Sequence, residues 1–261
     1  MAKRILVAPF AVVFVLALAG CASSGGSSVS LEQEWQVGQQ MADQVAQQVR
    51  FVNDPVANSY VRSVGERIKA QTPMANLPFT FHIVDDPNIN AFSIPGGHVY
   101  VNRGLITSAN KADELASVLA HEISHNVARH VVKQIERQQQ ISAIGGILLG
   151  QSPGALQEIV AQIVAGGAMA RFSRADEKEA DELGLRFMTA AGYNPQGMVD
   201  MFRTLQAQEK SQPGKVAQFF MDHPMTQDRI NDVQGRIGGM ASSSGLITDE
   251  PEFQEVRNRL R

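Results

Sequence analysis

The 261-residue chain has few cysteines and aromatic residues, and neither sign of charge dominates. It contains one cysteine, Cys21, so no disulfide can form within it. Aromatic residues make up 6% of the chain, and the core must therefore be built mainly from Ala, Val, Ile, Leu and Met. The formal net charge is −3, and no clustered basic segment indicates nucleic-acid binding. A hydrophobic content of 44% predicts an ordinary globular protein with one sizeable domain.

The single cysteine ends a segment typical of bacterial lipoprotein signals. Lys3 and Arg4 precede an apolar stretch at residues 5–18, and the sequence Leu-Ala-Gly-Cys at 18–21 matches the lipobox. We therefore interpret residues 1–20 as a lipoprotein signal peptide. Two alternatives stay open: an ordinary secretory signal with a chance cysteine, and a transmembrane anchor, although the stretch is short for a membrane span.

Cleavage before Cys21 would make this residue the lipid-modified N-terminus and anchor the chain in a membrane. Ala22 follows it. By resemblance to lipoproteins of Gram-negative bacteria, a residue other than Asp at this position implies sorting to the outer membrane, facing the periplasm. Residues 21–30 are rich in Ser and Gly and are expected to form a flexible linker.

Hydrophobic periodicity predicts a mainly α-helical domain with a small β-sheet, an α+β fold, over residues 31–240. Helices are expected at 31–50, 56–70, 111–140, 176–191, 195–207 and 224–237, and strands at 79–84, 91–94 and 98–101. Two apolar patches, 141–150 and 159–168, are expected to form a helical hairpin packed on the domain, with contact with lipid as the alternative. Residues 241–261 are expected to form a C-terminal tail.

The sequence His-Glu-Ile-Ser-His at 121–125 carries the clearest chemical signal. Residues four apart on a helix differ by about 40° around its axis, so His121 and His125 share one face. Two imidazoles placed in this way can bind a zinc ion, and Glu122 is positioned to act as a general base. The alternative is a pair of solvated histidines on a helix surface.

A catalytic zinc site needs a third protein ligand. The acidic segment at 172–184 is expected to be helical and offers Glu177, Glu179 and Glu182, among which spacing alone does not choose. Asp181 lies four residues after Glu177 and could accept a hydrogen bond from a ligating imidazole, which would fix its tautomer.

The remaining histidines are weaker candidates. His130 lies nine residues after the first ligand, but Ala128 and Val131 stand where the metzincin pattern requires Gly and His. We therefore expect His130 at the surface or behind the ligands. His82 and His98 lie on predicted strands and are interpreted as structural.

The motifs together resemble the CAAX-prenyl-protease/HtpX type of zinc endopeptidases, and within it the periplasmic outer-membrane group that includes BepA and LoiP. The resemblance covers nearly the whole mature chain. It rests on the 121–125 motif, Ser173-Arg174 with Glu177 and Ala180-Asp181, residues 90–97, residues 99–105, His223-Pro224 and Arg229-Ile230. Long members of the group carry C-terminal helical repeats, and none is expected after Ile237.

This resemblance implies a gluzincin-like fold with the His-Glu motif on a long central helix and one Zn²⁺ per chain. The family's third ligand is the first Glu of a Glu-x-x-Ala-Asp motif, which falls on Glu177. The resemblance also implies that His223 lies near the metal as a regulatory or transition-state group. Arg229 is expected to help stabilise the oxyanion, because a cation there would lower the barrier.

An edge strand beside the cleft is expected to hold the substrate. We assign this role to the segment Gly97, His98, Val99, Tyr100 and Val101, to which an extended chain could add through main-chain hydrogen bonds. This mode depends little on side chains and suits unfolded substrates.

The sequence thus predicts a zinc endopeptidase that hydrolyses misfolded or unfolded cell-envelope proteins in outer-membrane quality control. The expected partners are these substrates, the outer membrane through lipid on Cys21, and the outer-membrane assembly machinery. The alternative is a non-catalytic envelope lipoprotein that binds zinc or unfolded outer-membrane proteins as a chaperone or assembly factor. Glu122 argues against it, because a pure binding protein does not need that carboxylate.

Overall fold

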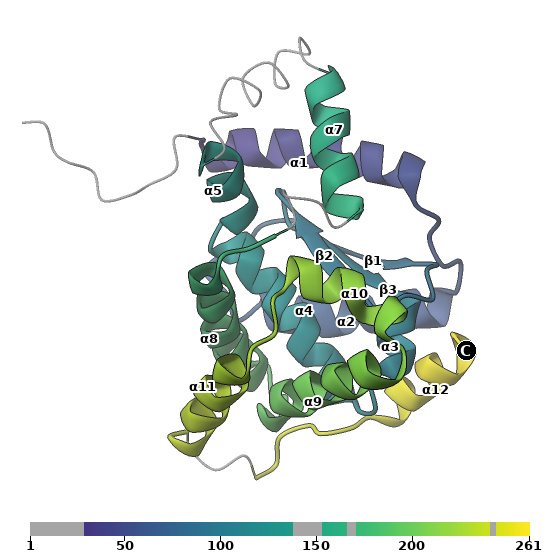
Figure 1. The fold of residues 1–261 in the computed structure, drawn as a ribbon, viewed down its shortest axis with the longest axis vertical. Coiled ribbons are helices and arrows are strands. Elements are labelled where there is room, and N and C mark those ends of the chain that lie inside the picture. Colours follow the sequence, from purple (N-terminus) through teal and green to yellow (C-terminus); the bar gives the residue numbers. More distant parts are fainter. Residues whose placement is uncertain (1–28, 138–152, 166–170, 241–243) are drawn as a thin grey trace, which may run out of the picture.

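A three-stranded sheet lies at the centre of the computed structural model, which describes residues 29–137, 153–165, 171–240 and 244–261 (Figure 1). Its strands are β1 (Thr80–Val84), β2 (Ala91–Ile94) and β3 (His98–Asn102), in the spatial order β1-β3-β2. Strand β3 pairs in parallel with β1 and antiparallel with β2. The predicted α+β class with a small sheet is confirmed.

Helices surround this sheet. They are α1 (Leu31–Gln48), α2 (Pro55–Lys69), α3 (Arg103–Ser108), α4 (Ala112–Val127), α5 (His130–Arg137), α7 (Pro153–Val164), α8 (Arg174–Ala190), α9 (Gln196–Ser211), α10 (Pro213–Asp222), α11 (Gln227–Gly238) and α12 (Pro251–Arg259). Ser30, Asp54 and Ser173 cap α1, α2 and α8, because each side chain accepts a hydrogen bond from a backbone N–H of the first turn. Helices α3 and α10 were not expected from the sequence, whereas some helix was expected among the last residues, where α12 lies.

The two faces of the sheet pack into two hydrophobic clusters, as strand alternation requires. On β3, Val99 and Val101 face the larger cluster, which contains residues of α2, α4 and α9. Tyr100 points to the opposite face, where Phe92 of β2 and Ile94 join residues of α1 and α7. Figure 1 shows α1 and α7 on one side of the sheet and α2 and α4 on the other.

Helix α4 runs through the centre of the larger cluster, and all its residues from Ala112 to Asn126 are buried. Helix α8 packs closely along it. Gly184 of α8 allows this approach, since a Cβ added there would lie 3.2 Å from the backbone nitrogen of His121. The two helices that carry the expected metal ligands are therefore held side by side.

The single helix expected at 111–140 is instead two helices, α4 and α5, over the described residues. Arg129, between them, has φ +58, which stops the helical hydrogen-bond pattern. Its guanidinium donates to the buried Glu34 of α1 at 2.6 Å and to the carbonyl of Val29 at 2.5 Å. These contacts with the N-terminal segment stabilise a conformation that costs a non-glycine residue about 1–2 kcal/mol.

The expected edge strand at 97–101 is also corrected. Residues 98–101 belong to β3, which is the central strand, so both of its sides are already paired. The edge strand next to the His-Glu motif is β2. The hydroxyl of Ser93 on β2 donates to the carbonyl of Glu122 at 3.2 Å and fixes this edge beside α4.

Other expectations fall partly outside the described residues. The signal peptide, Cys21 and the first arm of the 141–168 hairpin lie outside them, whereas part of the second arm is helix α7. The expected tail contains α12, whose Phe253 and Val256 are fully buried in the larger cluster, so the compact body continues to this helix. Among the described helices, none has the length and apolar character that crossing a membrane requires.

Candidate metal centre

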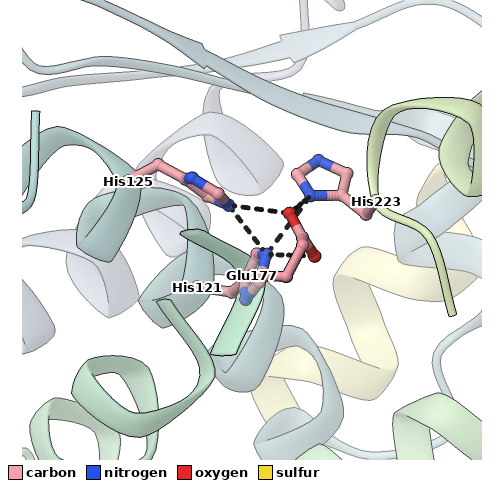
Figure 2. Close-up of side chains that lie close together, drawn as sticks. All are labelled: His121, His125, Glu177 and His223. Atoms are coloured by element: carbon pink, nitrogen blue, oxygen red, sulfur yellow. Dashed lines mark hydrogen bonds and ion pairs between the residues drawn. The ribbon is translucent and has the colours of Figure 1, made fainter. Parts of the chain in front are cut away.

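Four side chains from three parts of the fold converge on one point (Figure 2). His121 and His125 lie one turn apart on α4, Glu177 lies in the first turn of α8, and His223 directly follows α10. One potential ligand atom from each residue lies within 4.8 Å of those of the others, and all four residues are buried.

The distances within this cluster are short. The Nε2 atoms of His121 and His125 lie 3.0 Å apart, and His223 Nδ1 lies 3.2 Å from His121 Nε2. Glu177 Oε1 lies 3.1 Å from His223 Nδ1 and 3.4 Å from His125 Nε2. Three imidazole nitrogens and one carboxylate oxygen that face a common point are a donor set that suits zinc in four-fold coordination. The residues present therefore fit a zinc ion.

Of the three acids left open on α8, Glu177 is the one that reaches the histidines. Glu179 turns towards His130 at 3.2 Å, with 52% of its side chain exposed. Glu182 pairs with Arg236 at 2.9 Å. Each residue advances about 100° around a helix, so residues two and five positions after Glu177 project in other directions.

Asp181 and Arg229 lie behind the cluster. Asp181 Oδ1 lies 3.0 Å from His121 Nδ1, which is the contact expected from the sequence. This contact leaves Nε2 of His121 facing the cluster. A carboxylate in the position of Asp181 orients a metal-binding imidazole.

Arg229 contacts both carboxylates of α8 at the cluster. Its Nη1 lies 2.6 Å from Glu177 Oε2, and its Nε and Nη2 donate to the two oxygens of Asp181 at 2.7 Å each. Burial alone would raise the pKa of Glu177, but His223, Arg229 and His121 hold it well below its usual range. These contacts favour a role in holding the two carboxylates, and the expected oxyanion contact stays a prediction.

Glu122 lies next to the cluster in a fully buried position. Neither of its carboxylate oxygens has a hydrogen-bond partner among the described residues, and Oε1 lies 3.4 Å from His223 Nε2. Burying a carboxylate that accepts no hydrogen bond is unfavourable, and this position is consistent with a role in the chemistry of the site.

Two further side chains contact His125 from behind. The ring of Phe172 stacks on its imidazole with the centroids 3.9 Å apart, and His130 Nδ1 lies 2.9 Å from His125 Nδ1. Burial lowers the pKa of His130 and holds that of His125 well below its ordinary value, so both imidazoles are neutral. Phe172 was not predicted as part of the site, and its only signal in the sequence is its place just before the Ser-Arg motif.

His82 and His98 lie on the sheet and take no part in the cluster. His98 Nδ1 lies 2.8 Å from the hydroxyl of Thr80, and the ring of His82 stacks on that of Tyr100 at 5.3 Å. Both contacts are structural, in line with their interpretation from the sequence.

Comparisons with known proteins agree with this arrangement. Residues 55–237 match the model of peptidase family M48. The chain is 32% identical over 229 residues to the beta-barrel assembly-enhancing protease of Escherichia coli K12, covering 84% of this chain and 46% of that protein. It is 35% identical over 175 residues to the mitochondrial metalloendopeptidase OMA1 of Schizosaccharomyces pombe, covering 67% of this chain and 51% of that protein.

A third relative is the metalloprotease YcaL of Escherichia coli K12, which is 28% identical over 163 residues, 61% of this chain and 63% of that protein. The chain spans about half the length of the first curated relatives it matches. The family match includes both helices that supply the cluster, α4 and α8, together with His223. The chain therefore belongs to peptidase family M48.

Proposed function

We propose that this chain is a zinc-dependent endopeptidase in which His121, His125 and Glu177 bind the metal and Glu122 is the general base. The observation that carries the proposal is the buried Glu122 carboxylate, which accepts no hydrogen bond from the part of the chain that the structure describes and lies beside a cluster with the donor set of zinc. A purely structural zinc site has no use for this additional acid.

A bound zinc ion would polarise the scissile carbonyl and make a water molecule more acidic. Glu122 would accept the proton of that water and deliver it to the leaving amine. Asp181 would hold Nδ1 of His121 as the donor, while Arg229 would keep Glu177 ionised and in place. No covalent intermediate with the protein is required.

His223 fills the fourth corner of the cluster, whereas a catalytic zinc site keeps one position open for water or substrate. We infer that this arrangement is a closed state and that His223 leaves the cluster before hydrolysis. After this movement its imidazole would be available to contact the transition state.

We propose that an extended substrate pairs with the edge of β2, whose residues are buried in this arrangement and would have to be uncovered first. Asn102 donates to the carbonyl of Asn90, which makes this a hydrogen-bonded pair of the antiparallel ladder. By alternation, the N–H and C=O groups of Ala91 and Ser93 point away from β3. A substrate that pairs with them would run next to the metal cluster, because Ser93 is bonded to the backbone of Glu122.

A small hollow lies beside this edge, lined by Phe92, Ile163 and Phe172 and reaching Asp222 and His223. Its volume of about 10 Å³ holds about one water molecule, so it does not accommodate a substrate side chain in this arrangement. Recognition through main-chain pairing suits segments that are exposed in unfolded proteins.

The natural substrates are, in our proposal, misfolded or unfolded proteins of the bacterial cell envelope, with zinc as the metal and the outer membrane as the site of action. Lipid on Cys21 would provide the anchor after removal of residues 1–20. Relatives from Escherichia coli and Vibrio cholerae are named for enhancing β-barrel assembly, which supports this substrate class and a contact with the assembly machinery.

The proposal is tested by hydrolysis of casein by the zinc-loaded protein, with a chelator as a control. Glu122→Gln should retain one zinc per chain but lose about 10²–10⁴-fold in turnover, the usual contribution of a general base. His121→Ala should lose the metal itself. Zinc content is read by mass spectrometry. Unchanged hydrolysis by Glu122→Gln would refute the assignment, and no zinc in the wild type would refute the metal centre.

The anchor is tested separately in cells. Cys21→Ser should block maturation or release the protein from the membrane fraction, and unchanged fractionation would contradict the lipid assignment.

A further inference from the structure

His130 contacts the buried side of the metal cluster. Its Nδ1 lies 2.9 Å from Nδ1 of His125, and its Nε2 lies 3.2 Å from Glu179 Oε2. His130 is fully buried, although α5, which carries it, and α8, which carries Glu179, lie at the edge of the fold. A continuous row of polar atoms therefore leads from a proposed ligand to a carboxylate on the rim of the site.

The break between α4 and α5 makes this contact possible. On one unbroken helix, residues five apart point about 140° away from each other, so His130 could not face His125. The left-handed conformation of Arg129, held by Glu34, turns the chain and brings His130 back behind the ligand. The helix break is thus part of the architecture of the site.

The donor and acceptor capacity of each imidazole determines the proton positions along this row. A neutral imidazole has one N–H donor and one acceptor nitrogen. Nε2 of His125 faces the cluster and must offer its lone pair to a metal, so its Nδ1 carries the proton. His130 Nδ1 then accepts this proton's hydrogen bond, and His130 Nε2 carries the N–H that donates to Glu179.

We propose that His130 is a positioning residue that fixes the tautomer and orientation of His125, with Glu179 as the carboxylate that orients His130 in turn. The proposal rests on the zinc site described above. It gives each imidazole of the 121–125 motif its own carboxylate: Asp181 acts on His121 directly, and Glu179 acts on His125 through an intervening imidazole.

Asp176, the other carboxylate near His130, is less suited to orient this imidazole. Asp176 Oδ1 lies 3.7 Å from His130 Nε2, but its oxygens already accept hydrogen bonds from Ser173 and from Arg137. Glu179 is half exposed and has no other ion pair among the described residues. The inserted imidazole therefore lets a carboxylate at the surface act on a ligand that is itself fully buried.

The test is zinc affinity by chelator competition on the full-length protein. His130→Leu should weaken zinc binding about 10–100-fold, the usual loss when an outer partner of a metal ligand is removed. His130→Asn should fall between Leu and wild type, because its amide oxygen offers an acceptor near the position of Nδ1. His82→Leu is the matched control: it removes a histidine of the sheet that has no contact with the cluster, and its affinity should equal that of the wild type.

A second measurement separates positioning from general stability. The ¹⁵N shifts of the His125 imidazole in the metal-free protein should report protonation at Nδ1 in the wild type and a mixture of tautomers in His130→Leu. Glu179→Ala changes a half-exposed side chain, so it will fold if His130→Leu does not, and it should weaken zinc binding several-fold.

The outcomes are distinct. If the folded His130→Leu protein binds zinc within about threefold of the wild type, or if the His130→Asn and Glu179→Ala variants both equal it, the positioning role is wrong. If the wild type binds no zinc, the proposed metal centre fails, whatever His130 does.

Discussion

Replacing Arg229 by Met tests how the two carboxylates of the site are held together. Its guanidinium lies 2.6 Å from Glu177 and makes two 2.7 Å hydrogen bonds with Asp181, and all three side chains are nearly or fully buried. Removing one partner of a buried ion pair costs about 3–5 kcal/mol, because a charge is left without compensation. The variant Arg229→Met keeps the volume and removes the charge, so it should lower the stability of the metal-free protein by about this amount.

Thermal unfolding with and without zinc provides the assay. A loss of 3–5 kcal/mol corresponds to a fall of roughly 6–20 °C in the melting temperature of a domain of this size. Zinc should restore part of it, since the metal supplies positive charge beside Glu177. Arg229→Lys keeps the charge but cannot form the forked contact, and should lie between Met and wild type. Equal melting temperatures for Arg229→Met and wild type, in both metal states, would refute this reasoning.

Two further predictions concern the packing around the site. Gly184→Val should lower both stability and zinc affinity, because even a Cβ there lies 3.2 Å from the backbone of His121, and the larger side chain must push α8 and Glu177 away from α4; metal affinity equal to wild type would contradict this. Burial raises the pKa of Asp113 from 3.8 to about 7, so this residue stabilises the fold most below the unfolded pKa and its contribution is lost as pH rises through about 7. Asp113→Asn should therefore flatten the fall of stability between about pH 4 and 7 and raise stability at pH 8 by at most about 4 kcal/mol, measured by urea unfolding at several pH values.

Local sequence signals predicted most of the elements but not how they assemble. Apolar spacing located α1, α2, α8 and α9 within a few residues, because each buries one face in a hydrophobic cluster. The 121–125 motif also located two of the four clustered residues, since a helix fixes their relative positions. The choice of Glu177 over Glu179 and Glu182 needed the family motif, because it depends on which face of α8 meets α4.

The errors arose where distant residues decide local structure. No Gly or Pro marks the break after α4; the break depends on Arg129 reaching Glu34 in a helix almost a hundred residues earlier. The spatial order of the strands could not be predicted from local signals either, because β3 lies between two strands that precede it in the sequence. The edge role assigned to β3 from the sequence therefore falls one strand away from β2, which is the edge strand on this side of the sheet.

Arg229 balances part of the negative charge around the proposed ligands. Three carboxylates lie in or beside the cluster, namely Glu122, Glu177 and Asp181. When the imidazoles are neutral, Arg229 is the only positive charge among the described residues that contacts them. This balance of three negative charges against one positive leaves two, and an uncompensated charge is costly in a buried site. A divalent cation removes this imbalance. Without it, a proton on His223 supplies part of the missing charge: burial alone would lower the pKa of His223, but Glu177 and Glu122 raise it to about 9. Zinc and the His223 proton therefore compensate the same carboxylates, which makes binding of the metal and the charge state of His223 mutually dependent.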